Sequence, residues 1–170
     1  MLLEELPNDL LVEIVDWVGT DTFMRDYGIV IGRGTKSLHH LALCSRKLNT
    51  VATPVLYRTY TQTGEKALQE FLLRVLRNPD LGKHVKNFVA SEISEDEQLD
   101  MSSWAEDDFQ CCLVLINRIS STEKDSVLSS EKWMNDVRLG DWDALSGLLI
   151  SLLPNVEEID MIAYGSSECK

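Results

Sequence analysis

Apolar residues recur at helical spacing near the start of the chain. Five of them fall within one predicted helix: Leu10, Leu11, Ile14, Val15 and Val18. Pro7 precedes them and suits a first helical turn, where its missing N–H leaves no hydrogen bond unmade. Gly19 follows them and is expected to end the helix. The pattern therefore predicts an amphipathic helix between Pro7 and Gly19.

Two more helical runs follow within the first 60 residues. Ser37 is a favourable N-cap for a run that reaches Cys44, and Ser45 is a favourable N-cap for the next run. Pro54 is expected to break or kink this third helix, after which residues 55–60 tend toward extended structure. The three runs predict a small all-helical module.

Residues 19–36 separate the first two helices and are expected to form a loop. Residues 29–31 inside it are apolar and are expected either to form a short strand or to pack against the core. The segment is rich in glycine, but it has neither the Lys-Ser/Thr ending of a phosphate loop nor a G-x-G-x-x-G pattern. Nucleotide binding is therefore not indicated.

The second half of the chain mixes helices with strands. Residues 64–78 form an amphipathic pattern that Asn78-Pro79 ends, and residues 81–90 read as a turn leading into a strand. Residues 92–108 contain eight Asp and Glu and no Lys or Arg, which is typical of a mobile loop. Helices are then expected over 109–120 and 131–153.

The second of these helices should be interrupted around Gly140, and the chain closes with a turn and a strand over residues 153–162.

The two turn-strand segments share one spacing of apolar residues. Val85, Phe88 and Ala90 match Val156, Ile159 and Met161, and a leucine precedes each set. This is either a leucine-rich-repeat-like rung used twice or a chance agreement of two ordinary strands. If the rungs are real, the last strand has an open edge, which further repeats of a longer protein or a partner would cover.

The charge of the chain argues against two kinds of partner. The 170 residues include 16 Lys and Arg against 28 Asp and Glu, which gives a net charge of −12. Nucleic acid and anionic membranes both attract basic surfaces, so neither is an expected partner. The first residues lack a basic leader and no apolar run is long enough to span a bilayer.

The chemistry-bearing residues do not form a recognisable catalytic or metal site. His39 and His40 are adjacent on a helix and cannot chelate one metal together, and His84 has no partner at ligand spacing. The four cysteines form no C-x-x-C, and Cys44 and Cys112 are expected to be small core residues of a reduced cytoplasmic or nuclear protein. We therefore expect no metal, no cofactor and no enzymatic activity.

Two further groups of residues have plausible structural roles. Asp107 and Asp108 are expected to be solvated charges rather than a catalytic pair. Trp104, Trp133 and Trp142 are expected to be core or partly buried, with a role as partner anchors as the alternative. The fold expected overall is mainly α: a three-helix module over residues 1–60, followed by an α/β segment with two short strands over residues 64–170.

The first 60 residues resemble an F-box, in the form found in large fungal F-box families. The matching positions are Leu6-Pro7, Leu10-Leu11, Ile14, the run from Leu41 to Leu48, Ala52, Pro54 and Leu56-Tyr57. The helix and strand from Leu68 to Ala90 look like the region that follows the F-box in those proteins. The insertion at residues 19–36 departs from the family, in which a short link joins the first two helices.

The resemblance implies a non-enzymatic subunit of a Skp–cullin–F-box ubiquitin ligase. The N-terminal helices would dock onto a Skp-type adaptor, and through it onto a cullin, while the C-terminal leucine-rich-repeat-like region would present an unknown protein substrate. The expected adaptor-binding residues are Leu6, Pro7, Leu10, Leu11, Ile14, Leu41, Cys44 and Leu48. They exceed what one internal face of a small module needs, which is typical of an interface. The alternative is an interaction module that keeps the F-box fold without assembling a ligase.

Overall fold

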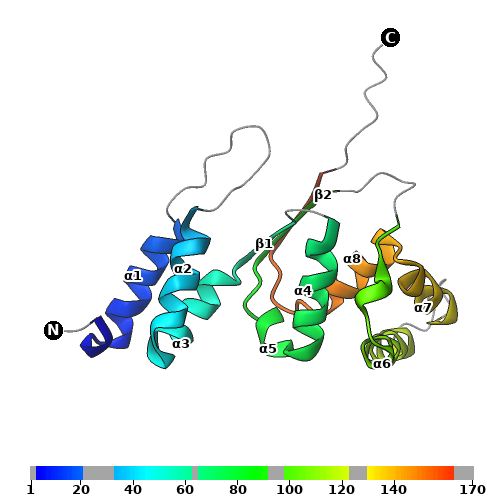
Figure 1. Cartoon of the computed structure of the whole chain (residues 1–170), viewed down its shortest axis with the longest axis horizontal. Helices are drawn as coiled ribbons and strands as arrows, with labels where there is room; N and C mark the ends of the chain where they lie inside the picture. Colours follow the sequence, from blue (N-terminus) through cyan, green and yellow to red (C-terminus); the bar gives the residue numbers. More distant parts are fainter. Residues whose placement is uncertain (1–2, 21–32, 63–64, 92–97, 123–129, 163–170) are drawn as a thin grey trace, which may run out of the picture.

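Eight α-helices and three parallel strands make up the part of the chain that the computed structural model describes, which is residues 3–20, 33–62, 65–91, 98–122 and 130–162. The N-terminal helices stand beside the sheet, and the later helices lie beyond it (Figure 1). The chain is therefore mainly helical, as the sequence predicted. The small sheet has three strands rather than the two that were expected.

The first three α-helices pack together at the N-terminal end. A short 3-10 turn, η1 (Leu3–Glu5), leads into α1 (Asn8–Thr20), α2 (Arg33–Cys44) and α3 (Arg46–Leu56). Their shared core cluster consists of Val15, Leu38, Ala42 and Ala52. Ser45 caps α3 as expected, because its hydroxyl oxygen accepts a hydrogen bond from the Leu48 N–H at 3.2 Å.

The boundaries of α1 and α2 differ from the expectation. Gly19 lies inside α1 rather than ending it, and a β-carbon there would stand 2.6 Å from Val55 Cγ1 and 3.2 Å from Leu38 Cδ1. Gly19 is therefore a close-packing position that lets α1 approach α2 and α3. The second helix begins at Arg33, so Ser37 is an interior residue and not its N-cap. The predicted strand at residues 29–31 lies outside the described residues.

Pro54 does not end α3 where it was expected to. The helix continues to Leu56, because Pro54 removes only its own N–H while the Tyr57 N–H still bonds to the Thr53 carbonyl at 3.0 Å. The chain then enters β1 (Thr59–Thr61). The sequence had suggested this additional strand only as a tendency toward extended structure.

The middle of the chain supplies α4 (Glu65–Arg77), α5 (Pro79–Gly82) and β2 (Asn87–Ser91). The predicted turn after residue 78 is thus a short helix that has a proline at its start. The last strand is β3 (Glu158–Ile162), and β2 lies between β1 and β3.

The three strands begin at a repeated backbone joint. The Arg58 carbonyl accepts hydrogen bonds from the N–H groups of Lys86 and Asn87, at 2.7 and 3.1 Å. The Lys86 carbonyl accepts in the same way from Glu157 and Glu158, at 2.7 and 3.1 Å. Each strand is therefore joined to the next by one carbonyl that serves two amides.

The register of the sheet matches the alignment of the two apolar segments in the sequence. Phe88 pairs with Ile159, and Ala90 pairs with Met161. Tyr60 pairs with Phe88 on the other side, so these side chains form rows across one face of the sheet. The burial of the two segments differs, because Phe88 and Ala90 are buried whereas Ile159 and Met161 are about half exposed.

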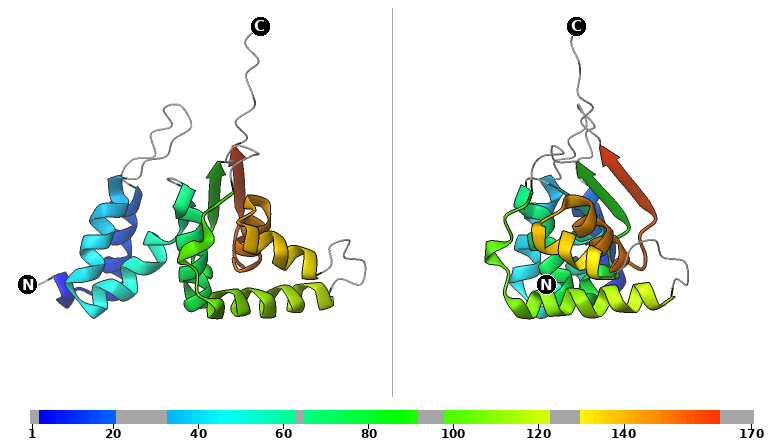
Figure 2. Two further views of the ribbon diagram at one scale, coloured as in Figure 1. Left: turned by 45° about the vertical axis from the view of Figure 1, so that its right-hand side comes forward. Right: turned by 90° about the vertical axis from the view of Figure 1, so that its right-hand side faces the viewer.

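The C-terminal helices pack over one side of the sheet. They are α6 (Glu106–Thr122), α7 (Ser130–Leu139) and α8 (Trp142–Ser151), preceded by the 3-10 turn η2 (Met101–Ser103). Figure 2 shows α6 running along one end of this part, below α7 and α8. The predicted interruption at Gly140 is confirmed: its φ is +77°, a conformation that favours glycine, and it separates α7 from α8.

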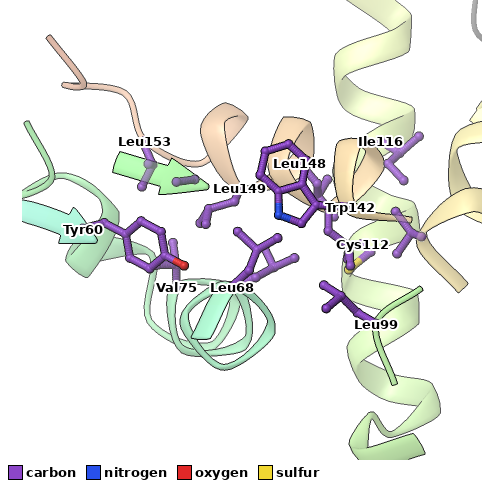
Figure 3. Close-up of a cluster of buried hydrophobic side chains, with 14 of the residues drawn as sticks. Tyr60, Leu68, Val75, Leu99, Cys112, Ile116, Trp142, Leu148, Leu149 and Leu153 are labelled. Carbon is purple, nitrogen blue, oxygen red and sulfur yellow. The ribbon is translucent and has the colours of Figure 1, made fainter. Parts of the chain in front are cut away.

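The main core lies between the sheet, α4, α6 and α8. Figure 3 shows Trp142 among leucines of α8 and α4 and beside Cys112 of α6. Trp104 and Trp142 are buried, as expected, and Trp133 is half-buried and donates its ring N–H to the Ala144 carbonyl at 3.1 Å.

The described part of the acidic segment 92–108 is not a loose loop. Leu99 and Trp104 are buried, and residues 106–108 form the first turn of α6. Asp108 is also buried, which corrects the expectation of a solvated charge. The number of acidic residues did not predict this, because the few apolar residues of the segment, such as Leu99 and Trp104, are buried and hold the backbone in place. Residues 92–97 lie outside the described residues.

Candidate docking surface

A stripe of apolar side chains runs along the exposed side of α1. Pro7, Leu10, Ile14 and Trp17 stand at i, i+3, i+7 and i+10, so they share one side of the helix. Leu10 is 46% exposed, Ile14 37% and Trp17 81%. The core side of the same helix carries Val15, so α1 is apolar on two sides, and the buried cluster of the module uses the side of Val15. We call these four residues the α1 stripe.

The corner between α2 and α3 lies beside the start of the α1 stripe. The Lys47 ammonium donates a hydrogen bond to the Leu6 carbonyl at 2.8 Å, which ties the start of α3 to the residue before Pro7. Leu43, at this corner, is 72% exposed. In Figure 1 the start of α1, the end of α2 and the start of α3 meet at the same end of the helical module. The corner therefore places another exposed apolar residue at the end of the module where the α1 stripe begins.

One side of the α1 stripe is acidic. Asp9, Glu13 and Asp16 recur at i, i+4 and i+7, and Asp16 accepts a hydrogen bond from the Arg58 guanidinium at 2.6 Å. Asp9 also lies in the first turn of α1, where a negative charge is favourable beside the helix dipole. A complementary partner surface would be apolar at its centre and basic along one rim.

The eight residues expected to bind an adaptor divide into two groups. Leu11 and Leu48 are buried in the module, so they support the fold and cannot contact a partner in this conformation. This corrects the prediction for those two residues, and the reason is that α1 and α3 turn them away from solvent. The other six are exposed or half-buried: Leu6, Pro7, Leu10, Ile14, Leu41 and Cys44.

The structure adds two exposed residues that the sequence analysis did not select. They are Trp17 and Leu43, the most exposed of the large apolar residues described. Trp17 could have been found, because it continues the spacing of Leu10 and Ile14 by three residues. Leu43 had no comparable signal, since the apolar run around it gives no indication of which side faces solvent.

The cysteines divide by burial. Cys112 is fully buried as expected, and burial above all raises the pKa of its thiol to about 12. Cys44 is exposed rather than part of the core, and its thiol donates a hydrogen bond to the His40 carbonyl at 3.2 Å.

Within the described ranges, no cluster of three or more His, Cys, Asp or Glu is placed to hold a metal ion. None of the described helices is long and apolar enough to cross a membrane.

A second apolar feature lies at the edge of the sheet. Ile159 and Met161 of β3 continue the rows of Phe88 and Ala90, and they are 47% and 46% exposed. Only β2 pairs with β3 among the described strands. In the described part of the chain, the outer side of β3 is therefore an open edge.

Comparison with known proteins gives no independent assignment. No family model, no curated protein and no solved structure matches the chain. Its function must therefore be argued from the docking surface itself and from the sequence resemblance to the F-box.

Proposed function

We propose that the chain is an F-box substrate-receptor subunit that docks a Skp-type adaptor through the α1 stripe and the α2–α3 corner. The observation that carries this proposal is the exposure of Leu10, Ile14 and Trp17 along one side of α1. Large apolar side chains gathered on one side of a helix usually mark an interface, and tryptophan is enriched among the residues that dominate binding energy.

The buried cluster of the module does not include these residues. Val15, Leu38, Ala42 and Ala52 form the buried cluster between α1, α2 and α3. Leu10 and Ile14 lie outside this cluster and are exposed, which favours a role in binding over a role in stability. The positions also coincide with the Leu-Pro and Leu-x-x-x-Ile pattern on which the F-box resemblance rests.

In this role the protein performs no chemistry on its substrate. The adaptor and a cullin would connect it to a ubiquitin-charged enzyme, and the C-terminal region would hold a protein substrate nearby. The contribution of the subunit is then proximity, which raises the effective concentration of substrate lysines. The repeated joint at Arg58 and Lys86, and the 28-residue spacing of β1 and β2, support a leucine-rich-repeat-like C-terminal region, whereas the 71 residues from Lys86 to Glu157 exceed a regular repeat.

Co-purification with a Skp adaptor tests the docking surface. We expect a one-to-one complex on size exclusion at micromolar concentration. Ile14→Glu places a charge in the centre of the α1 stripe and should weaken binding by about 30-fold or more, measured by titration calorimetry. Val12→Glu is the matched control, because Val12 is similarly exposed, at 45%, but lies on another side of α1. It should retain binding within about threefold.

Two outcomes would contradict the proposal in different ways. If the wild-type chain and the adaptor elute separately at micromolar concentration, the ligase assignment is wrong. If the complex forms but Ile14→Glu binds as well as Val12→Glu, the interface lies on other residues. A complex with the adaptor that fails to recruit a cullin would favour the alternative, an interaction module that keeps the fold without assembling a ligase.

A further inference from the structure

A cavity of about 610 Å³ lies where the N-terminal helices meet β1 and α4. Its walls come from α2, the end of α3, β1 and α4, so it lies between parts of the chain that are distant in sequence. Six of the lining residues carry its chemistry: Lys36, His39, His40, Tyr57, Phe71 and Arg74. The volume falls in the range typical of sites for small molecules. None of the α1 stripe residues lines this cavity.

The charge of the cavity is opposite to that of the chain. The charged residues that line it are Lys36 of α2 and Arg74 of α4, and the imidazoles of His39 and His40 lie beside them. The described residues that line it include no Asp or Glu, although the chain has 28 acidic residues and a net charge of −12. A hollow bordered by one sign of charge concentrates ions of the other sign. The cavity is therefore suited to an anion.

A flat aromatic wall stands beside these basic groups. The rings of Tyr57 and Phe71 lie 6.3 Å apart, with an angle of 22° between their planes. Tyr60 also stacks on Phe71. The centroids of these two rings lie 4.5 Å apart, with an angle of 23° between their planes. Rings stacked in this way cover one another, so another planar ring can stack only on an outer face of the group.

Arg74 is held at the junction of the two surfaces. Its guanidinium donates a hydrogen bond to the Tyr57 hydroxyl at 3.3 Å. This contact keeps a planar cation beside the aromatic wall, and an arginine fork pairs well with carboxylate or phosphate oxygens. The same hydrogen bond links α4 to Tyr57, the residue that follows α3.

We propose that this cavity binds a small aromatic anion, that is, a planar ring bearing a phosphate or a carboxylate group. The ring stacks in the region of Tyr57 and Phe71, and the anionic group is held by Arg74 and Lys36. Because Lys36 belongs to α2 and Arg74 to α4, the bound molecule connects the N-terminal helices to the rest of the chain. This site is separate from the α1 stripe and does not depend on adaptor docking.

Three simple probes test the proposal by titration calorimetry of the full chain. Phenyl phosphate carries both the ring and the anion, inorganic phosphate carries only the anion, and benzyl alcohol carries only the ring. We expect phenyl phosphate to bind about tenfold or more tightly than either of the other two, because only it uses both surfaces. Equal affinities for phenyl phosphate and inorganic phosphate would overturn the proposal, as would an absence of phenyl phosphate binding.

Charge-removing variants locate the site. Arg74→Gln and Lys36→Gln should each weaken phenyl phosphate by about threefold to tenfold, since each removes one charge-assisted contact. Arg118→Gln is the matched control, because Arg118 is an exposed arginine on α6 that does not line the cavity. Thermal unfolding of each variant confirms that the fold is intact. Equal weakening by all three variants would mean that phenyl phosphate binds through diffuse charge, and the proposal would be wrong.

Discussion

Asp108 joins two helices through a single carboxylate. Its oxygens accept hydrogen bonds from the Arg77 guanidinium at 2.9, 3.0 and 3.3 Å, and from the Ala105 N–H at 3.1 Å. Ala105 precedes α6 and has no polar side chain that could cap the helix. Asp108, at the third helical position, instead accepts from the backbone N–H of Ala105, which is one of the two hydrogen bonds of a capping box. The side chain is therefore buried because it satisfies a helix start and an arginine at once.

Replacing Asp108 should destabilise the protein, whereas replacing its neighbour should not. Asp108→Ala removes the bond to Ala105 and the contact with Arg77, and we expect a loss of about 1–2 kcal/mol. The loss remains moderate because Arg77 is largely exposed and stays solvated. Asp107→Ala is the control, since Asp107 is exposed, and it should change the free energy of unfolding by less than about 0.5 kcal/mol. Urea denaturation of both variants measures the difference, and equal effects would show that Asp108 has no special role.

Local signals were readable from the sequence at some residues and absent at others. Ser45 caps its helix and Gly140 interrupts one, as expected, because both effects depend on a few neighbouring residues. The partner of Asp108 lies 31 residues earlier, so no local pattern announces it. In the docking surface, the helical period identified the apolar residues of α1 but could not say which of its two apolar sides faces the core. For this reason Leu11 was grouped with Leu10.

At the scale of secondary-structure elements, the turn between α7 and α8 depends on close backbone contact. The Leu99 N–H donates a hydrogen bond to the Gly140 carbonyl at 3.0 Å. A β-carbon on Gly140 would stand 2.1 Å from the Leu99 carbonyl oxygen. The segment before α6 therefore lies directly on the turn, and both the positive φ and the lack of a side chain are required there.

Two identical substitutions should have opposite effects in this region. Gly140→Ala combines an unfavourable φ with a backbone clash, and we expect it to destabilise the protein by about 2–4 kcal/mol. Gly147→Ala lies inside α8, where the nearest atom to the new β-carbon is Trp133 Cζ2 at an ordinary 3.8 Å. It should stabilise the protein by about 0.5–1 kcal/mol, because alanine favours the helix.

Thermal and urea denaturation of both glycine variants check the signs. A stabilising Gly140→Ala, or a Gly147→Ala as damaging as Gly140→Ala, would contradict the packing described at the turn.

The same reasoning explains why Gly19 was misjudged as a helix end. A glycine that permits close packing and a glycine that permits a turn look alike in the sequence, and only the neighbouring elements distinguish them.

For the whole molecule, the sequence predicted the helical content and two of the three strands. It indicated β1 only as a tendency toward extended structure, because β1 has three residues and its pairing with β2 is non-local. The acidic segment was also misjudged at this scale. Arg77 of α4 and Arg138 of α7 pair with Asp108 and Glu106, so part of the negative charge belongs to contacts between helices.

The repeated joint at Arg58 and Lys86 has a consequence for the order in which the sheet assembles. Thr59 and Asn87 are separated by 28 residues, whereas Lys86 and its contact Glu157 are separated by 71. Closing the longer connection costs about 0.8 kcal/mol more chain entropy than closing the shorter one. The pairing of β1 with β2 should therefore precede the arrival of β3, for which β2 then serves as a template.

Pulse-labelling hydrogen exchange during refolding would reveal this order. We expect the amides of residues 87–89 to gain protection with α4, before those of residues 158–161. Simultaneous protection would indicate that the sheet forms in one step. In the expected order, the segment that folds last is also the one that carries the exposed Ile159 and Met161. The open edge of the folded protein would then be its latest-formed part, and β3 the strand most often detached from it.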